Sequence, residues 1–118
     1  MAIFSSHILN SLTGLHATNV SISIFKINSI GEKNLFFENS TDENGRIIKE
    51  FYLSNDDFRC TFEMIVKTGD YFKKESKEIY KQRIVSEIVI RFKMESPNKK
   101  YHIPIIVSPN SYSIWWSK

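Results

Sequence analysis

Apolar and polar residues alternate with a period of two along much of this chain. Such alternation is typical of β-strands that bury one face and expose the other. Four segments show it most clearly: Val20–Ile24, Cys60–Val66, about Ser86–Lys93 and Tyr101–Val107. Four shorter candidates are His7–Asn10, Asn34–Glu38, Ile47–Phe51 and Tyr112–Trp116. The pattern therefore predicts about eight short strands.

Turn residues separate these segments, and one stretch between them has a helical composition. Asn44-Gly45 is a strong turn dipeptide, because both residues tolerate positive φ. The segment Tyr71–Lys81 is rich in Lys and Glu and follows Asp70, which predicts one short helix capped by that aspartate. Many short strands with a single helical excursion predict an all-β sandwich of two sheets, formed as one domain over residues 1–118.

Composition and charge narrow the class of protein. The chain has 118 residues, of which 42% are hydrophobic and 25% charged, so it fits a single globular core. The net charge of +3 is spread without the basic, aromatic-interleaved stripe that nucleic-acid binding favours. No apolar run approaches the roughly 20 residues of a membrane span. We therefore expect neither nucleic acid nor membrane as a partner.

The single cysteine and the N-terminal segment bear on location. Cys60 excludes an intrachain disulfide, and its place in an alternating strand favours a buried structural thiol. Residues 1–6 lack the basic and apolar regions of a secretory signal. A cytoplasmic location is expected.

Histidines and one arginine are the candidates for chemistry. His7 opens a predicted strand and His102 lies opposite the apolar face of its own strand, although each taken singly is also explained as a structural or exposed side chain. Arg46 follows the Asn44-Gly45 turn, where it is either a surface cation or a fork of donors for an anionic or carbonyl-rich ligand. For His16, in the loop after Gly14, only a structural or exposed role is expected.

Motifs for metal, phosphate and serine-nucleophile chemistry are missing from the sequence. We find no glycine-rich phosphate loop, no Gly-x-Ser-x-Gly elbow and no Cys/His metal spacing. Any catalysis is therefore expected to need no metal and no cofactor.

Four motifs follow one another over nearly the whole chain. They are Ser6-His7-Ile8-Leu9-Asn10, Thr41 to Arg46, Tyr71-Phe72, and Tyr101-His102-Ile103-Pro104 running through Ser108-Pro109 into Ser111-Tyr112-Ser113. In this order and spacing they resemble the transthyretin and 5-hydroxyisourate hydrolase family, and the last motif is the most specific. The resemblance implies a transthyretin-like sandwich of two four-stranded sheets.

The resemblance favours the hydrolase branch of that family. The hydrolases have a His, an Arg and a second His at positions that correspond here to His7, Arg46 and His102, and the hormone carriers lack all three. The resemblance implies that these residues line a channel between the subunits of a homotetramer. It also implies their reaction, which is hydrolytic ring opening of 5-hydroxyisourate, an oxidised purine of urate breakdown, without metal or cofactor. His7 and His102 would transfer protons, and Arg46 would hold the substrate and stabilise developing charge.

The C-terminus departs from the family pattern. The hydrolases end in Tyr-Arg-Gly-Ser, whereas this chain ends in Trp115, Trp116, Ser117 and Lys118, to which we assign substrate binding. Tryptophan offers one N–H donor and a large apolar face, so the change affects substrate fit and rate more than fold. One alternative is a transthyretin-like carrier whose aromatic channel holds a flat ligand. In another, both tryptophans simply pack at a subunit interface.

Overall fold

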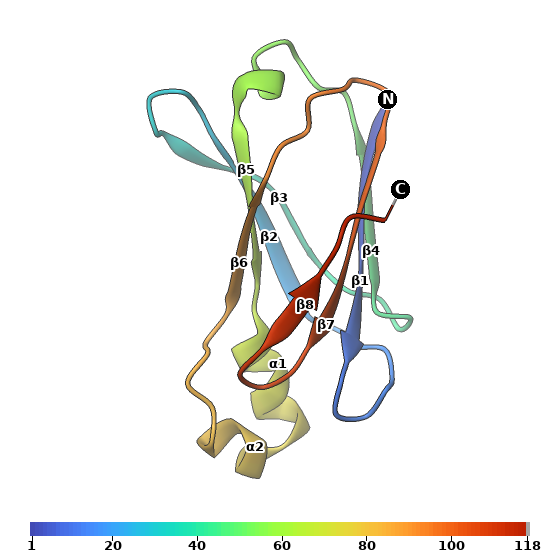
Figure 1. Cartoon of the computed structure of the whole chain (residues 1–118), viewed down its shortest axis with the longest axis vertical. Helices are drawn as coiled ribbons and strands as arrows, with labels where there is room; N and C mark the ends of the chain where they lie inside the picture. The colour runs from blue at the N-terminus through green and yellow to red at the C-terminus, as the bar shows by residue number, and fades with distance from the viewer. Residues whose placement is uncertain (118) are drawn as a thin grey trace.

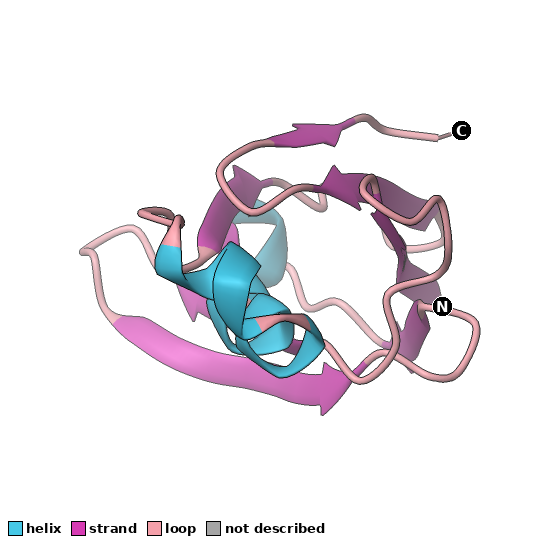
Figure 2. Ribbon diagram, turned by 90° about the horizontal axis from the view of Figure 1, so that it is seen from below, coloured by secondary structure: helices cyan, strands magenta, loops and turns pink. Residues whose placement is uncertain are grey.

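Residues 1–117 are described by the computed structural model and form a sandwich of two four-stranded sheets, as the sequence predicts (Figure 1). One sheet has the strand order β4-β1-β7-β8 and the other β3-β2-β5-β6. The strands are β1 (Ala2–Asn10), β2 (Ser21–Ile27), β3 (Lys33–Ser40), β4 (Arg46–Phe51), β5 (Thr61–Val66), β6 (Ile88–Phe92), β7 (Lys100–Val107) and β8 (Tyr112–Ile114). Seen along the strands, the two sheets enclose the core and the α-helices lie across one end (Figure 2).

The core fills the space between the sheets with large apolar side chains. Phe4 of β1 stacks on Phe92 of β6 and meets the edge of Phe37 of β3, so aromatic rings join the two layers. The apolar positions of β7 that the alternation assigns to the core are indeed buried. The pattern of inward and outward residues therefore also fixes which side chains face away from the core.

Strand β1 begins at Ala2, earlier than the predicted segment His7–Asn10, and two of its inward positions are polar. Ser6 and Asn10 are buried, which interrupts the apolar alternation that would otherwise reveal the strand. Their polar atoms have partners: Ser6 Oγ donates to the carbonyl of Ile103 at 2.6 Å, and Asn10 Nδ2 donates to the Tyr71 hydroxyl at 3.0 Å. Buried polar groups with such partners cost little stability.

The predicted single helix is in fact two helices. Helix α1 (Thr68–Glu75) and helix α2 (Lys77–Lys81) are separated by Ser76, whose φ of −161° and ψ of 122° are extended. The Ser76 hydroxyl accepts a hydrogen bond from the Ile79 amide at 3.4 Å and so caps α2. Serine side chains compete for backbone groups in this way, which favours a helix start over a helix interior. Asp70 lies inside the first turn of α1 and does not cap it.

A turn of 3₁₀ helix, η1 (Asp57–Arg59), precedes β5, and Cys60 directly after it is buried as expected. None of the helices within residues 1–117 is long and apolar enough to cross a membrane.

Candidate active site

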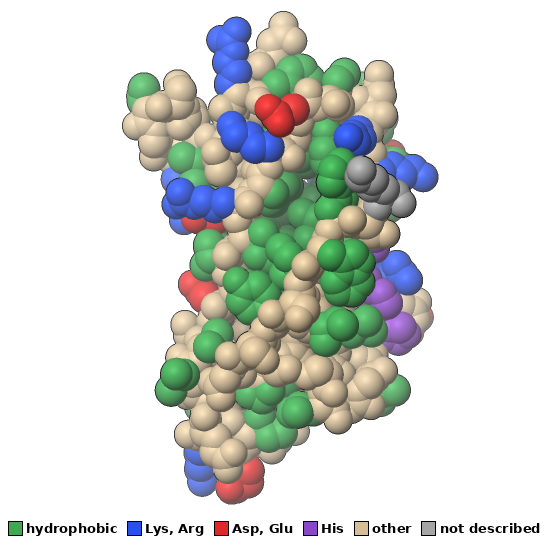
Figure 3. Space-filling model, viewed as in Figure 1, with side chains coloured by type: hydrophobic (Ala, Val, Ile, Leu, Met, Phe, Trp, Pro, Cys, Tyr) green, Lys and Arg blue, Asp and Glu red, His purple; other side chains and the backbone are tan. Residues whose placement is uncertain are grey.

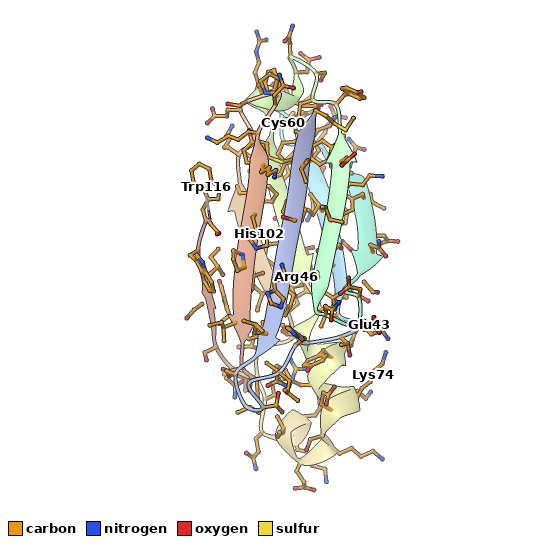
Figure 4. The ribbon with its side chains drawn as sticks, turned by 90° about the vertical axis from the view of Figure 1, so that its right-hand side faces the viewer. Glu43, Arg46, Cys60, Lys74, His102 and Trp116 are labelled. Carbon is orange, nitrogen blue, oxygen red and sulfur yellow. The ribbon has the colours of Figure 1, made fainter. Side chains whose placement is uncertain are left out.

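The outward face of β1 gathers the predicted catalytic residues. Alternate residues of β1 point away from the core, and these include Ser5 and His7. His7 pairs with Arg46 of β4 in the antiparallel register, and Ser5 pairs with His102 of β7 in the parallel register. Paired residues of neighbouring strands share a face, so the three residues meet on one side of the sheet (Figure 4).

His102 is held by a hydrogen bond to β1. Its Nδ1 lies 2.8 Å from Ser5 Oγ, and the ring is partly buried. Burial, and then the positive charge of Arg46, lower the pKa of His102 from its ordinary value. The neutral imidazole is therefore favoured, and neutral imidazole is the form that can accept a proton.

Arg46 is placed by a tight turn. The Asp42 carboxylate accepts hydrogen bonds from the backbone N–H of Asn44 at 2.8 Å and of Arg46 at 2.9 Å. Chiefly these backbone hydrogen bonds hold the pKa of Asp42 below its ordinary value, so it stays ionised. Because the Asp42 carboxylate accepts a hydrogen bond from the Arg46 N–H, the backbone of Arg46 is held in place beside His7.

Gly45, between Asn44 and Arg46, allows β1 and the turn to approach closely. Its φ is +72°, and a Cβ added there would lie 2.6 Å from the carbonyl oxygen of Ile8 and 3.2 Å from the Cβ of His16. The Gly45 carbonyl also accepts a hydrogen bond from the Ile8 amide at 2.8 Å. A side chain at this position would therefore push the turn away from β1.

We expect Gly45→Ala to lower the free energy of unfolding by about 2 kcal/mol or more, since the left-handed conformation costs about 1–2 kcal/mol and the contact adds to it. Urea unfolding followed by tryptophan fluorescence measures this. Gly14→Ala is the matched control, because Gly14 has a φ of +75° but no atom within 4 Å of an added Cβ. Equal losses in the two variants would contradict a role for close approach at Gly45.

His16 also belongs to this face, although the sequence suggests only a structural or exposed role. His7 Nε2 and His16 Nδ1 lie 2.8 Å apart, with ring centroids separated by 5.0 Å. His16 forms a β-bridge with Leu9 of β1, which brings it to the strand that bears His7. Burial, then Arg46, and then the two other histidines lower the pKa of His7.

A shallow pocket of about 470 Å³ lies on the same face. Its lining combines Arg46 and His102 with residues of β1, β4, β7, the turn before β4 and the C-terminal segment: Ser5, Ser6, Asp42, Ile47, Ile48, Lys100 and Ser117. The Ser117 amide donates to the His102 carbonyl at 3.0 Å, so the C-terminal segment runs beside β7 up to the pocket. In the space-filling view, histidine side chains emerge at the right-hand edge beside a cationic side chain (Figure 3).

The other C-terminal residues take different positions. Trp116 lines a separate cavity of about 180 Å³ with Phe92, Tyr101 and Ile103, between the edges of the two sheets. The Lys99 ammonium lies 4.6 Å from the centre of a Trp116 ring. The Trp115 amide donates to the Pro104 carbonyl at 3.4 Å, and Lys118 lies outside the described residues. Substrate binding by these four residues stays a prediction. Within one subunit Ser117 lines the pocket that contains Arg46 and His102, and Trp116 lines the separate cavity.

Within residues 1–117, no three His, Cys, Asp or Glu side chains are grouped so that they could hold a metal ion. Catalysis without metal or cofactor stays a prediction.

Comparison with known proteins identifies the family. The sequence model of the HIUase/Transthyretin family matches residues 4–116. This chain belongs to that family. It is 29% identical over 111 residues to 5-hydroxyisourate hydrolase of Halalkalibacterium halodurans, covering 94% of this chain and 93% of the relative. It is 32% identical over 113 residues to 5-hydroxyisourate hydrolase of Salmonella dublin, covering 96% of this chain and 79% of that relative.

Solved structures share the fold of this member of the HIUase/Transthyretin family. The 5-hydroxyisourate hydrolase of Klebsiella pneumoniae superposes with a TM-score of 0.76 at 21% identity, and each chain is covered over 100% of its length. An (S)-allantoin synthase superposes with a TM-score of 0.79 at 22% identity, covering 99% of this chain and 44% of that longer one.

Three residues of this family member were missed as contributors to the site: Ser5, His16 and Asp42. A signal for His16 does exist in the sequence. Asn10 and Gly14 mark a tight turn directly after a strand, and the chain that returns from such a turn runs back along that strand. Ser5 has no comparable signal, because its partner His102 is 97 positions away.

Proposed function

We propose that this protein is a 5-hydroxyisourate hydrolase, which opens the ring of an oxidised purine in urate breakdown. The observation that supports it most directly is the set of His7, Arg46 and His102 from three neighbouring strands on one face of one sheet. The names of the relatives agree with it, because both curated relatives described above are 5-hydroxyisourate hydrolases.

In the proposed reaction a neutral histidine removes a proton from water, and the resulting hydroxide attacks a ring carbonyl carbon. In the tautomer whose Nδ1–H donates to Ser5 Oγ, Nε2 of His102 is unprotonated and accepts the proton from water. The guanidinium of Arg46 stabilises the negative charge that develops on the carbonyl oxygen. The ring C–N bond then breaks, and the leaving nitrogen takes a proton from the imidazolium or from its partner histidine. Water is added across the bond, so no redox partner is required.

The carrier alternative loses part of its support. It depended on a channel walled by both tryptophans, whereas Trp116 lies with Phe92 and Ile103 between the sheet edges. A carrier also has no use for a His–Arg–His set. We therefore place the hydrolase first.

A homotetramer with the site between subunits is also part of this proposal. Apolar side chains stand exposed around the catalytic face, among them Ile48 at 66% and Trp115 at 45% of their surface, and such side chains are typical of buried interfaces. Light scattering at micromolar concentration tests the assembly, and a stable monomer would overturn it. A cytoplasmic location is proposed as well, supported by a single, buried cysteine.

The activity is tested by adding purified protein to freshly generated 5-hydroxyisourate and following the ultraviolet absorbance. We expect decay much faster than the spontaneous reaction and proportional to protein concentration. Decay at the spontaneous rate, with the protein folded, would remove the hydrolase proposal and restore the carrier.

The pH profile of kcat/KM should reflect the lowered pKa values of His7 and His102. A lowered pKa means that the proton is lost at lower pH, so the neutral base persists below the ordinary imidazole value of 6.5. We expect kcat/KM to stay level from pH 8 to below 6.5 and to fall only in more acid solution. An inflection of kcat/KM above pH 6.5 in the wild type would mean that burial does not control the pKa values of His7 and His102.

A further inference from the structure

The pairing of His7 with His16 is the feature from which we infer a further role. The two rings approach to 2.8 Å between His7 Nε2 and His16 Nδ1. A hydrogen bond between two neutral imidazoles carries one proton, so one ring must donate and the other accept. The state of His16 therefore decides which nitrogen of His7 bears hydrogen.

The backbone on both sides of His16 is fixed, so this approach does not depend on a loose loop. On one side the Leu15 carbonyl accepts a hydrogen bond from the Asn10 amide at 2.9 Å. On the other side the Ala17 amide donates to the Ile8 carbonyl at 2.9 Å, and the Ala17 carbonyl accepts from the Thr41 hydroxyl at 2.7 Å. The His16 side chain is exposed, but its Cα is anchored to β1 and to the segment before β4.

Gly45 provides the space for this arrangement. A Cβ at Gly45 would lie 3.2 Å from the Cβ of His16, so the turn that carries Arg46 packs directly against His16. Arg46, His7 and His16 therefore share one corner of the catalytic face, and the Asp42 carboxylate lies close enough that a positive charge on His16 would favour its ionised form.

We propose that His16 is a positioning residue for the hydrolysis, acting through His7 by holding its ring and fixing one tautomer. The inference rests on the proposed function, because it assigns His16 to the site in which His7 transfers a proton. His16 itself need not touch the substrate. Without this hydrogen bond the His7 ring keeps its backbone hydrogen bond to Asn44 but is held less firmly, so its tautomers exchange more readily, and only one of the two presents the nitrogen needed for proton transfer.

The charges around His7 predict how a variant should behave. After burial, Arg46 on β4 lowers the pKa of His7, and a positive charge on His16 in the loop after β1 or on His102 of β7 would lower it further, whereas a backbone hydrogen bond to Asn44 raises it. Removing His16 takes away a group that repels a protonated His7, and it also exposes the ring to water. Both changes raise the pKa of His7.

The test compares His16→Ala with His16→Asn. In His16→Ala we expect kcat to fall about threefold to tenfold, the loss expected for one hydrogen bond, with KM nearly unchanged. The pKa of His7, read from its ring proton signals by NMR, should rise. His16→Asn should restore most of kcat, because the asparagine amide places a donor and an acceptor near the position of Nδ1.

A double variant separates positioning from general destabilisation. In a His7→Asn background, His16→Ala should cause no further loss of kcat, because the partner through which it acts is gone. An unchanged kcat and an unchanged His7 pKa in His16→Ala would overturn the proposal, as would equal losses in the two backgrounds. If the wild type does not hydrolyse 5-hydroxyisourate, the NMR titration still tests the His7–His16 coupling, so the two failures are distinguishable.

Discussion

Replacing His102 with Asn should lower kcat/KM for 5-hydroxyisourate by about two to four orders of magnitude, the usual contribution of a general acid or base. Asparagine retains a hydrogen-bonding group near Nδ1, so the contact with Ser5 is preserved while the titrating nitrogen is lost. The loss should therefore arise in chemistry and not in folding. Steady-state rates, with circular dichroism to confirm the fold, measure it.

Ser5→Ala is the matched control for this variant. It removes the hydrogen bond to His102 Nδ1 and leaves the imidazole in place, so we expect a loss of only about threefold to tenfold. The acid limb of the pH profile should survive in Ser5→Ala and lose its His102 component in His102→Asn. A His102→Asn enzyme with near wild-type activity would mean that another group moves the proton.

Replacing Arg46 with Ala should lower kcat by about two to three orders of magnitude, as the loss of a donor to a developing oxyanion does. The fold should be kept, because Asp42 binds the backbone N–H of Arg46 and not its side chain. Arg46→Lys should recover part of the loss, since lysine supplies the charge without the planar fork of donors. Single-turnover and steady-state rates measure the effect.

Lys100→Ala tests whether the role of Arg46 could be filled by any positive charge in the pocket. Lys100 lines the same pocket as Arg46, but from β7, opposite Ile3 in the β1 register. We expect less than a tenfold change, because a mobile ammonium at the rim is well screened by water. Equal losses in Lys100→Ala and Arg46→Ala would mean that Arg46 acts only through the general field of the pocket.

Much of the fold follows from local sequence because a sheet that is buried on one face imposes a period of two. That rule was sufficient for β5 and β7, whose inward residues are apolar. It missed the first half of β1, where Ser6 faces inward and is satisfied by a carbonyl of β7 that no local pattern can reveal. It also joined two helices into one, because the extended backbone at Ser76 has no counterpart in the Lys and Glu composition around it.

Residues of the candidate site could be predicted from the sequence only where they belong to a family motif. His7, Arg46 and His102 were found through their motifs, and the strand register places them on one face. His16 was missed because the alternating pattern says nothing about the path of the loop after β1, which only the turn between Asn10 and Gly14 indicates. For Trp116, alignment with the family tail suggests a wall of the substrate site, which stays a prediction. That Trp116 and Phe92 line one cavity depends on how two distant segments meet, and no local pattern indicates it.

The parallel pairing of β1 with β7 has a consequence for the order in which the protein is made. Its partners, such as Ser5 and His102, are 97 positions apart, while all four strands of the other sheet lie between residues 21 and 92. Contacts between such distant segments close slowly, because the chain entropy of a long loop must be overcome first. During synthesis on the ribosome, the sheet β3-β2-β5-β6 can therefore form before β7 is available to pair with β1. An unpaired strand edge invites pairing with other chains, so we expect this interval to be the one in which the nascent protein most needs protection from aggregation.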